Sequence, residues 1–286
     1  MDTESLIHVR FAFVKRTVRV VGVTSFRLAE NTFNGGMFTP DLVNDDAVVD
    51  GLKRIRMATG KWERVSLLLP DSWFRMNILE VPTMPEKPAE ALEVVRWSLK
   101  RTLPIAPEEL RIAREILQTT PNGVKVLAIS AREKTLDSVE RAFTTAGFDI
   151  VMIEPVGLNI WNAITAREAE TTGDRLFLSI RERDFTTAVF RGNQPVFLRS
   201  RNLSTERPLL QEIRLSASYL REALRSDRFE TCYLAGEAVT EETAEIVARE
   251  FNSPVKRIRA GDIADGVTPE AAGYDAAITA GAGVFS

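Results

Sequence analysis

The chain has almost none of the residues that build disulfides or transition-metal centres. Its 286 residues include one cysteine, Cys232, and one histidine, His8. A single cysteine excludes an internal disulfide framework and is typical of a reducing compartment. A single histidine excludes a histidine-rich metal site, and no zinc-ligand spacing occurs. Both residues stand in apolar, strand-like stretches, which favours an inert buried thiol and a structural histidine over a Cys–His catalytic pair.

Long apolar runs and an excess of charge of one sign are also missing. No apolar run approaches the roughly 20 residues that span a bilayer. The first ten residues, MDTESLIHVR, do not have the basic and then apolar pattern of a signal peptide. A formal net charge of −3 gives no reason to expect nucleic acid or a membrane surface as the main partner. We therefore expect a cytoplasmic globular protein, long enough for one large domain or two ordinary ones.

Catalytic motifs are absent or incomplete. The stretch Gly51–Lys61 superficially resembles a phosphate loop, but Ile55 stands at its first glycine and Trp62 at its magnesium-coordinating Ser or Thr. No Gly-x-Ser-x-Gly elbow is present. The acidic residues Glu182 and Asp184 alternate with two arginines, which indicates a turn with local ion pairs rather than acid–base catalysis. Local motifs therefore predict no metal site and no catalytic residue.

The clearest pattern is a pair of similar hairpins about half a chain apart. Leu176–Phe190 reads LFLSIRERDFTTAVF, and Val9–Val21 reads VRFAFVKRTVRVV. Each has an apolar strand, a charged turn and a second strand of β-formers, which predicts a β-hairpin. Their repetition predicts an internally duplicated α/β protein in which each hairpin opens one half.

Strands and helices alternate along the rest of the chain, which predicts mixed sheets. The polar break Thr171–Asp174 separates a first domain, residues 1–170, from a second, residues 171–286. We expect a smaller α/β subdomain, residues 82–148 approximately, to be inserted in the first domain. The tail AAGYDAAITAGAGVFS predicts a closing helix that packs back on the first domain, and the polar stretch Asn31–Asp41 predicts a loop.

Turn and cap residues place the remaining elements. The strands that we expect are Val65–Leu69, Phe74–Val81, a strand from Leu110, Val124–Ser130, Ile150–Glu154, Pro195–Arg201, Thr231–Ala235 and Val255–Arg259. The helices that we expect are one from near Asn44 to Gly60, Ala89–Arg101, Lys134–Ala146, Val156–Ala169, Glu206–Leu224 and Glu241–Phe251.

Two longer phrases carry a resemblance to a known family. They read KPAEALEVVRWSLKRTLPIAPEEL and VLAISAREKTLDSVERAFTTAGFDIVMIEPVGLNIWNAI. With LAGEAVTEETAEIVAREFNSPV and the Ala/Gly tail, their order resembles that of the PilM-type type IV pilus assembly proteins, members of the actin-like, or ribonuclease-H-like, superfamily. The resemblance runs over most of the chain. It implies an actin-like fold with two halves around a cleft.

The resemblance also identifies where a nucleotide would bind and how this chain departs from the family pattern. In that family the first hairpin carries Asp-x-Gly, then small hydroxyl residues and a Lys. In the first hairpin Ala12 stands at the Asp, Val14 at the Gly and Arg19 at the Lys, and Lys15 and Arg16 lie in the turn. In the second hairpin Ser179 stands at the Asp and Arg181 at the Gly. At the Gly-Gly on the adenosine side this chain has Gly236-Glu237. A β-branched residue obstructs the close backbone approach that phosphate needs, and an alanine offers Mg²⁺ no oxygen. The pattern therefore predicts an actin-like fold that has lost ATP and has no cofactor.

The resemblance implies a non-catalytic scaffold at the cytoplasmic face of the inner membrane. Its partner would be the short cytoplasmic tail of a PilN-like membrane protein. The process would be pilus assembly or type II secretion-type assembly, the second because the related GspL-like cytoplasmic domains share the fold. Self-association stays open. We expect the tail to dock between the inserted subdomain and the main body. Trp97, Leu103 and Ile105 are the candidates for the wall of this groove, and ordinary core packing is the alternative for each.

An enzyme is the rival interpretation. An active actin-like ATPase or small-molecule kinase with displaced phosphate loops would bind ATP and magnesium and use Asp184 or Asp174 as metal anchor or base. The joint loss of both Asp-x-Gly patterns favours the scaffold. An unrelated α/β binding protein is the third alternative.

Overall fold

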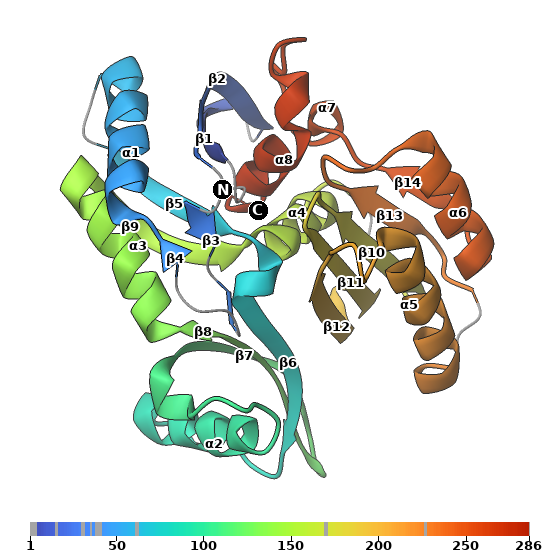
Figure 1. The fold of residues 1–286 in the computed structure, drawn as a ribbon. Coiled ribbons are helices and arrows are strands. Elements are labelled where there is room, and N and C mark those ends of the chain that lie inside the picture. The colour runs from blue at the N-terminus through green and yellow to red at the C-terminus, as the bar shows by residue number, and fades with distance from the viewer. Residues whose placement is uncertain are drawn as a thin grey trace.

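The computed structural model describes residues 5–14, 17–29, 32–34, 36–37, 42–60, 63–168, 171–225 and 228–285. Strands and helices alternate through most of this range (Figure 1). The strands are β1 Ser5–Val14, β2 Thr17–Arg27, β3 Phe33–Asn34, β4 Leu42–Val43, β5 Glu63–Leu69, β6 Phe74–Val81, β7 Leu110–Thr120, β8 Gly123–Arg132, β9 Phe148–Pro155, β10 Asp174–Ile180, β11 Asp184–Arg191, β12 Gln194–Asn202, β13 Cys232–Ala235 and β14 Val255–Arg257. The helices are α1 Asp45–Thr59, α2 Pro88–Lys100, α3 Glu133–Ala146, α4 Val156–Thr165, α5 Leu209–Ala223, α6 Glu241–Phe251, α7 Ala260–Ile263 and α8 Asp275–Gly283, with short 3₁₀ turns η1 Asp71–Trp73, η2 Pro107–Glu109 and η3 Ala272–Tyr274.

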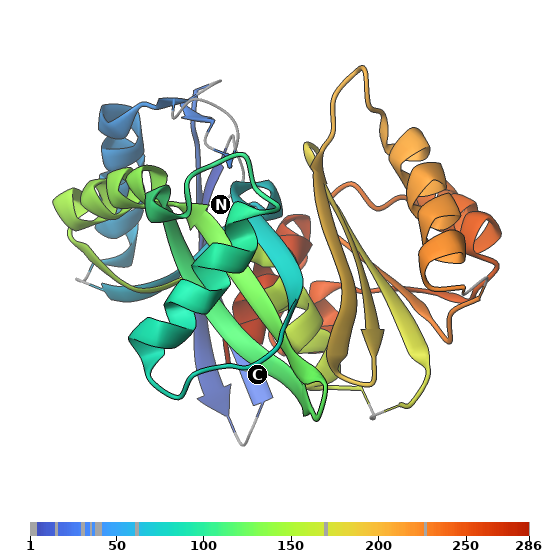
Figure 2. The same cartoon turned by 90° about the horizontal axis from the view of Figure 1, so that it is seen from below.

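A five-stranded mixed sheet forms the centre of the C-terminal part, in the order β12-β11-β10-β13-β14. The pairs β10–β11 and β11–β12 are antiparallel, whereas β10–β13 and β13–β14 are parallel. Helices α5 and α6 pack on one face and α4 and α8 on the other (Figures 1 and 2). Because helices cover both faces, every residue from Arg175 to Ile180 is buried, which explains the unbroken apolar run at this point.

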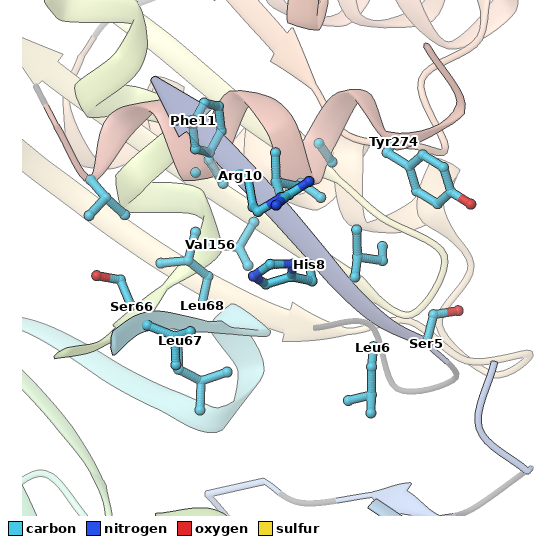
Figure 3. A pocket seen from close by; sticks show the side chains of 18 of the residues that line it. Ser5, Leu6, His8, Arg10, Phe11, Ser66, Leu67, Leu68, Val156 and Tyr274 are labelled. Atoms are coloured by element: carbon cyan, nitrogen blue, oxygen red, sulfur yellow. The ribbon is translucent and has the colours of Figure 1, made fainter. Parts of the chain in front are cut away.

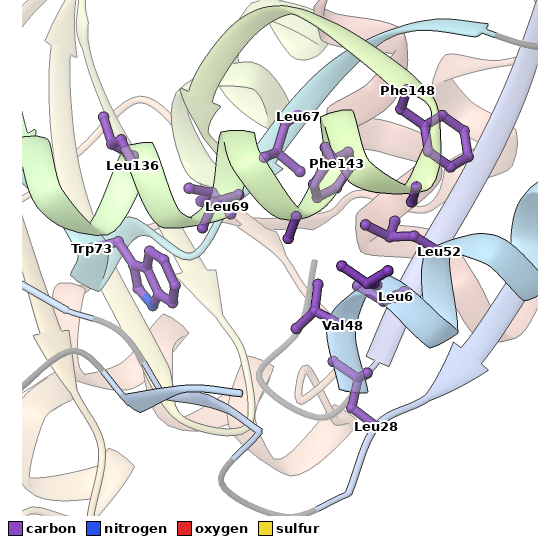
Figure 4. Packing of buried hydrophobic residues seen from close by; sticks show 14 of the residues in the cluster. Leu6, Leu28, Val48, Leu52, Leu67, Leu69, Trp73, Leu136, Phe143 and Phe148 are labelled. Carbon is purple, nitrogen blue, oxygen red and sulfur yellow. The ribbon is translucent and has the colours of Figure 1, made fainter. Parts of the chain in front are cut away.

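The described N-terminal part is built from three separate pairs of strands, of which β3–β4 is the shortest, and two packed helices. In the described residues β1 pairs only with β2, antiparallel, and β5 only with β9, parallel. Leu6, Leu52 and Phe143 join β1, α1 and α3 in one core cluster (Figure 4). Helix α1 begins where the Asn44 side chain accepts the N–H of Ala47 and ends at a left-handed Gly60, as the cap residues predict.

A small antiparallel sheet, β6-β8-β7, extends from this part with α2 on one face (Figure 1). Val95 and Leu99 of α2 are fully buried against Val126 of β8 and its neighbours. Strand β6 also packs beside β12 of the five-stranded sheet. The insertion therefore contacts both halves of the chain.

The two hairpins and most other predicted elements are confirmed within a few residues. No helix among the described residues has the length and apolar character that a membrane crossing requires. The predicted turn residues Lys15 and Arg16 and much of the predicted loop Asn31–Asp41 lie outside the described residues. The division into domains 1–170 and 171–286 stays a prediction.

Three predictions about single elements are wrong in part. The apolar sequence of Ile150–Glu154 indicates a buried strand, but among the described residues β9 pairs only with β5, and 48% of Val151 is exposed. The helix predicted to reach Ala169 ends at Thr165, whose hydroxyl donates to the Asn162 carbonyl in the last turn. The helix predicted from Glu206 begins at Leu209, because Pro208 stands at its cap and a turn precedes it.

Helix α8 packs so closely against α4 that Gly283 has no room for a side chain. A Cβ atom at Gly283 would lie 1.8 Å from the carbonyl oxygen of Asn159. The small residues of the tail therefore allow two helix backbones to approach each other, and the end of the chain is packed on residues that precede the polar break.

We expect the substitution Gly283→Ala to lower the free energy of unfolding by about 1–3 kcal/mol, because α8 must move away from α4. Gly261→Ala is the matched control, since an added Cβ there meets nothing within 4 Å. Urea titration of both variants measures the difference. Equal stabilities of the two variants would contradict the close contact of α8 with α4.

Candidate functional site

The turn between β10 and β11 holds an ion pair at the position where the resemblance implies bound phosphate. Arg181 Nε lies 3.2 Å from Glu237 Oε1, and the Arg181 side chain is 9% exposed. The same Glu237 oxygen accepts the backbone N–H of Glu182 at 3.4 Å. A carboxylate of the chain itself thus occupies the place of an anion against this turn.

Gly236 is required by the backbone of this site. Its φ is +119°, and a Cβ atom there would lie 2.1 Å from the Ile180 carbonyl oxygen. The same carbonyl accepts the N–H of Ala238 at 3.2 Å. The loop after β13 therefore closes directly over the end of β10.

The other positions at which the resemblance implies nucleotide contacts carry no carboxylate. Ser179 is 2% exposed, and its hydroxyl has no hydrogen-bond partner among the described residues. Ala12 lies opposite Arg19 in the β1–β2 ladder, and Val14 lies opposite Thr17 with 43% of its surface exposed. The roles of these positions stay predictions.

Two buried carboxyl groups meet where η1 packs on β11. Asp184 Oδ2 accepts the N–H of Ser72 at 3.4 Å, and its Oδ1 accepts the Ser200 hydroxyl at 3.3 Å. Asp71 is 1% exposed, and its Oδ1 accepts the N–H of Gly157 at 2.7 Å. This carboxyl pair links the strand end before η1 to the second hairpin.

Burial and the negative charge of Asp71 together raise the pKa of Asp184 to about 7, against the opposing effect of the Arg181 guanidinium. Burial also raises the pKa of Asp71. Two adjacent carboxyl groups in a dry site cannot both be ionised at low cost, so the pair holds a proton near neutral pH.

The aspartates of the rival enzyme hypothesis lie at opposite ends of the second hairpin. Asp184 belongs to the buried pair, whereas Asp174 forms two hydrogen bonds with Arg191, at 2.7 and 2.8 Å. In the part of the chain that the structure describes, no group of three or more His, Cys, Asp or Glu side chains could hold a metal ion.

The sequence-predicted partner residues divide into one exposed and two buried side chains. Trp97 on α2 is 63% exposed, with the Arg101 guanidinium 5.5 Å from the centre of its ring. Leu103 and Ile105 are 7% and 8% exposed and belong to the core between α2 and the β6-β8-β7 sheet. Only Trp97 is therefore accessible to a partner in this structure.

A cavity of about 830 Å³ lies between β1 and β5, beneath α8 (Figure 3). Its lining is largely apolar, and Arg181 and Glu237 line it as well. His8 points into this region from β1 (Figure 3). Cys232 is not among the residues that line it: the residue is fully buried, as the apolar strand predicts, and burial raises the pKa of its thiol to about 12.

Local sequence patterns do not identify Asp71, Glu237 or the cavity as features of a site. Asp71 follows a strand and a proline, as many surface aspartates do, and only the packing of η1 on β11 buries it. Glu237 meets Arg181 from 56 positions away in the sequence. Only the resemblance, which places Gly236-Glu237 and Arg181 in one cleft, predicts from the sequence that Glu237 and Arg181 lie close together.

Neither a family model nor a curated protein matches this chain. Solved structures do match it. A PilM-PilN type IV pilus biogenesis complex has a TM-score of 0.80 at 20% identity, over 99% of this chain and 96% of that chain. A Bacteroides thetaiotaomicron protein of unknown function with an actin-like ATPase fold has a TM-score of 0.56 at 11% identity, over 98% and 93% of the two chains. The cytoplasmic domain of EpsL, an inner-membrane component of the Vibrio cholerae type II secretion system, has a TM-score of 0.49 at 12% identity, over 86% and 94%.

The likenesses to the PilM-PilN complex and to the Bacteroides thetaiotaomicron protein show a shared fold. The two arrangements that the sequence predicts, paired hairpins and mixed sheets with an inserted smaller sheet, are confirmed. The resemblance to PilM-type proteins holds for the fold over nearly the whole chain. The chain has the actin-like fold.

Proposed function

We propose that the chain is a PilM-like scaffold that binds the short tail of a PilN-like membrane protein in type IV pilus or related secretion assembly. The observation that carries the proposal is the full-length likeness to the PilM-PilN complex, with a TM-score of 0.80. Through such a partner the chain would be held at the cytoplasmic face of the inner membrane.

The proposal includes the loss of ATP binding and of catalysis. The Glu237 carboxylate fills the turn at Arg181 and Glu182, and a phosphate there would meet its negative charge. The first hairpin has Ala12 where the family pattern has its metal-orienting aspartate. Both observations support a cleft that serves structure rather than phosphoryl transfer.

The tail-binding role is tested with the protein encoded beside this chain's gene, which we expect to have one membrane span and a short cytoplasmic tail. A synthetic peptide of that tail should bind saturably in isothermal titration calorimetry. Because exposed aromatic residues often dominate such contacts, Trp97→Ala should weaken binding by at least about tenfold.

Met57→Ala is the matched control, since Met57 on α1 is 76% exposed and lies outside the inserted subdomain. It should leave the affinity unchanged. Absence of saturable binding at high micromolar concentration would contradict the tail-binding role, and equal effects of the two variants would place the docking surface elsewhere.

A further inference from the structure

Arginine side chains gather where the start of β6 packs beside β12. Strand β6 belongs to the three-stranded sheet, and β12 is an edge strand of the five-stranded sheet. The backbone of Ser72, just before β6, and the hydroxyl of Ser200 on β12 both donate to the Asp184 carboxyl group. This shared contact places Arg75 of β6 within reach of the charge of Arg201 on β12.

Arg201 shares one face of β12 with Arg199. The two residues are two positions apart, so their side chains point to the same side of the sheet. Helix α5 covers that side, because Arg199 Nη2 lies 3.3 Å from Glu212 Oε2 of this helix. Ser200, which contacts Asp184, lies on the opposite face. Asp184 is therefore not the counter-ion of Arg201.

Arg201 has no carboxylate of its own. Among the described residues, no hydrogen bond or ion pair joins its guanidinium to an acidic side chain. The acidic group that acts on it, Glu212, is 3% exposed and is already paired with Arg199. Arg207, in the turn before α5, adds a further positive charge. Positive charge is therefore in surplus around Arg201.

The surroundings make this surplus unfavourable. Burial and the charges of Arg199 and Arg207 lower the pKa of Arg201, against the opposing effect of Glu212. Burial and the charge of Arg201 lower the pKa of Arg75. Like charges held together in partly dry surroundings are unfavourable unless an anion balances them. Arg75 and Arg201 are both partly exposed, so a small solute can reach them.

The chemistry of the cluster favours a phosphate group as this anion. A guanidinium group presents N–H donors in a planar fork that matches the oxygens of phosphate or carboxylate. A carboxylate carries one negative charge, whereas a phosphate group carries about 1.5 to 2 at pH 7 and offers three strong acceptor oxygens. Positive charge comes here from β6, from β12 and from the turn before α5, so a dianion with several acceptors balances it better.

We propose that Arg75, Arg201 and Arg207 form a binding site for a dianionic phosphate group, either free phosphate or the phosphate of a small monoester. The bound group would accept hydrogen bonds from β6 on one side and from β12 on the other. It would thereby hold the three-stranded sheet against the five-stranded sheet. None of the three arginines belongs to the surface at Trp97 or to the two hairpin turns, so the proposal does not depend on the tail-binding role.

Isothermal titration calorimetry of the full chain tests the site at pH 8 and constant ionic strength in chloride. The probes are inorganic phosphate and glycerol 3-phosphate, and their comparison distinguishes free phosphate from a monoester. We expect saturable binding of at least one probe with a dissociation constant below about 1 mM. Acetate should bind at least about tenfold more weakly. Absence of binding by both probes, or equal binding of acetate, would overturn the proposal.

Substitutions locate the site. Arg75→Gln and Arg201→Gln should each weaken binding of the better probe by at least about tenfold, because each removes a charge-assisted contact. Arg64→Gln is the matched control, since it removes the same charge from a side chain that is 76% exposed and pairs with Asp149. It should change the affinity by less than about twofold. An equal loss in the control would mean general ionic attraction and no site.

Thermal melts separate binding from folding. Phosphate at a saturating concentration should raise the melting temperature of the wild-type chain and leave that of Arg201→Gln unchanged. The rise should not require magnesium, because guanidinium groups bind phosphate without a metal. The diagnostic quantity is the rise with phosphate, so a variant of lower basal stability still gives an answer. Equal rises in both chains would assign Arg201 a structural role only and overturn the proposal.

Discussion

Replacing Asp184 with asparagine should raise the stability of the protein at pH 8 and flatten its dependence on pH between 5 and 8. The gain at pH 8 should be on the order of 2 kcal/mol, or about 5 °C in melting temperature for a chain of this size. The reason is that an ionised Asp184 is buried beside the negative charge of Asp71, whereas asparagine is neutral.

The sign of the pH dependence follows from the direction of the pKa shift. Burial and the negative charge of Asp71 together raise the pKa of Asp184 from its ordinary value of 3.8 to about 7. Between these values the folded state holds a proton that the unfolded state releases, so stability falls as pH rises. The stabilising contribution is complete below about pH 4 and is lost as pH rises through 7. Asp184→Asn removes this group and with it the slope.

Melting temperatures from pH 4 to 8 measure the effect, with Asp149→Asn as the control. Asp149 forms an exposed ion pair with Arg64 at 3.4 Å, and its loss should change stability by less than about 1 kcal/mol at any pH. If Asp184→Asn instead destabilises the protein at pH 8, Arg181 compensates the charge of the ionised Asp184, and the unfavourable pairing with Asp71 is wrong.

Replacing Trp161 with alanine should destabilise the protein by about 3–5 kcal/mol, the usual cost of removing a buried aromatic side chain. Trp161 on α4 is 3% exposed and stacks on Phe190 of β11 with ring centres 3.9 Å apart. The guanidinium of the fully buried Arg175 lies 4.8 Å from the Trp161 ring. Helix α4 precedes the polar break, so the substitution opens a cavity between the two halves of the chain.

Trp97→Ala is the matched control, because the same change is made on the exposed face of α2. It should cost at most about 1 kcal/mol, the value of an exposed cation–π contact with Arg101. Guanidinium titration of both variants gives the comparison. A loss at Trp161 no larger than that at Trp97 would mean that α4 does not join the two halves.

The elements that sequence patterns predict well have local causes. Asn44 caps α1 through its own side chain, and Gly60 and Gly147 end helices by adopting left-handed backbone conformations that glycine permits. The hairpin of β10 and β11 follows from an apolar run, a charged turn and a second run of β-formers. Each of these signals lies within a few residues of the structure that it predicts.

The features that sequence patterns miss depend on contacts between distant segments. Val151 has an apolar sequence context but lies at the end of a sheet, and the pattern of one strand does not reveal how many partners it has. The pairing of Asp71 with Asp184 joins residues 113 positions apart. The gap between β1 and β5 likewise depends on how two ladders are placed, and no local pattern records this.

The measurement that tests the scaffold account most directly is a thermal melt with and without millimolar Mg-ATP. A ligand present at about 100 times its dissociation constant adds about 2.7 kcal/mol of stability, which is a shift of several degrees for a chain of this size. The account predicts no shift, because Glu237 accepts the Glu182 N–H in the turn where the resemblance implies phosphate, and Ala12 stands where the family pattern has an aspartate. A reproducible rise in melting temperature that requires both magnesium and ATP would contradict it.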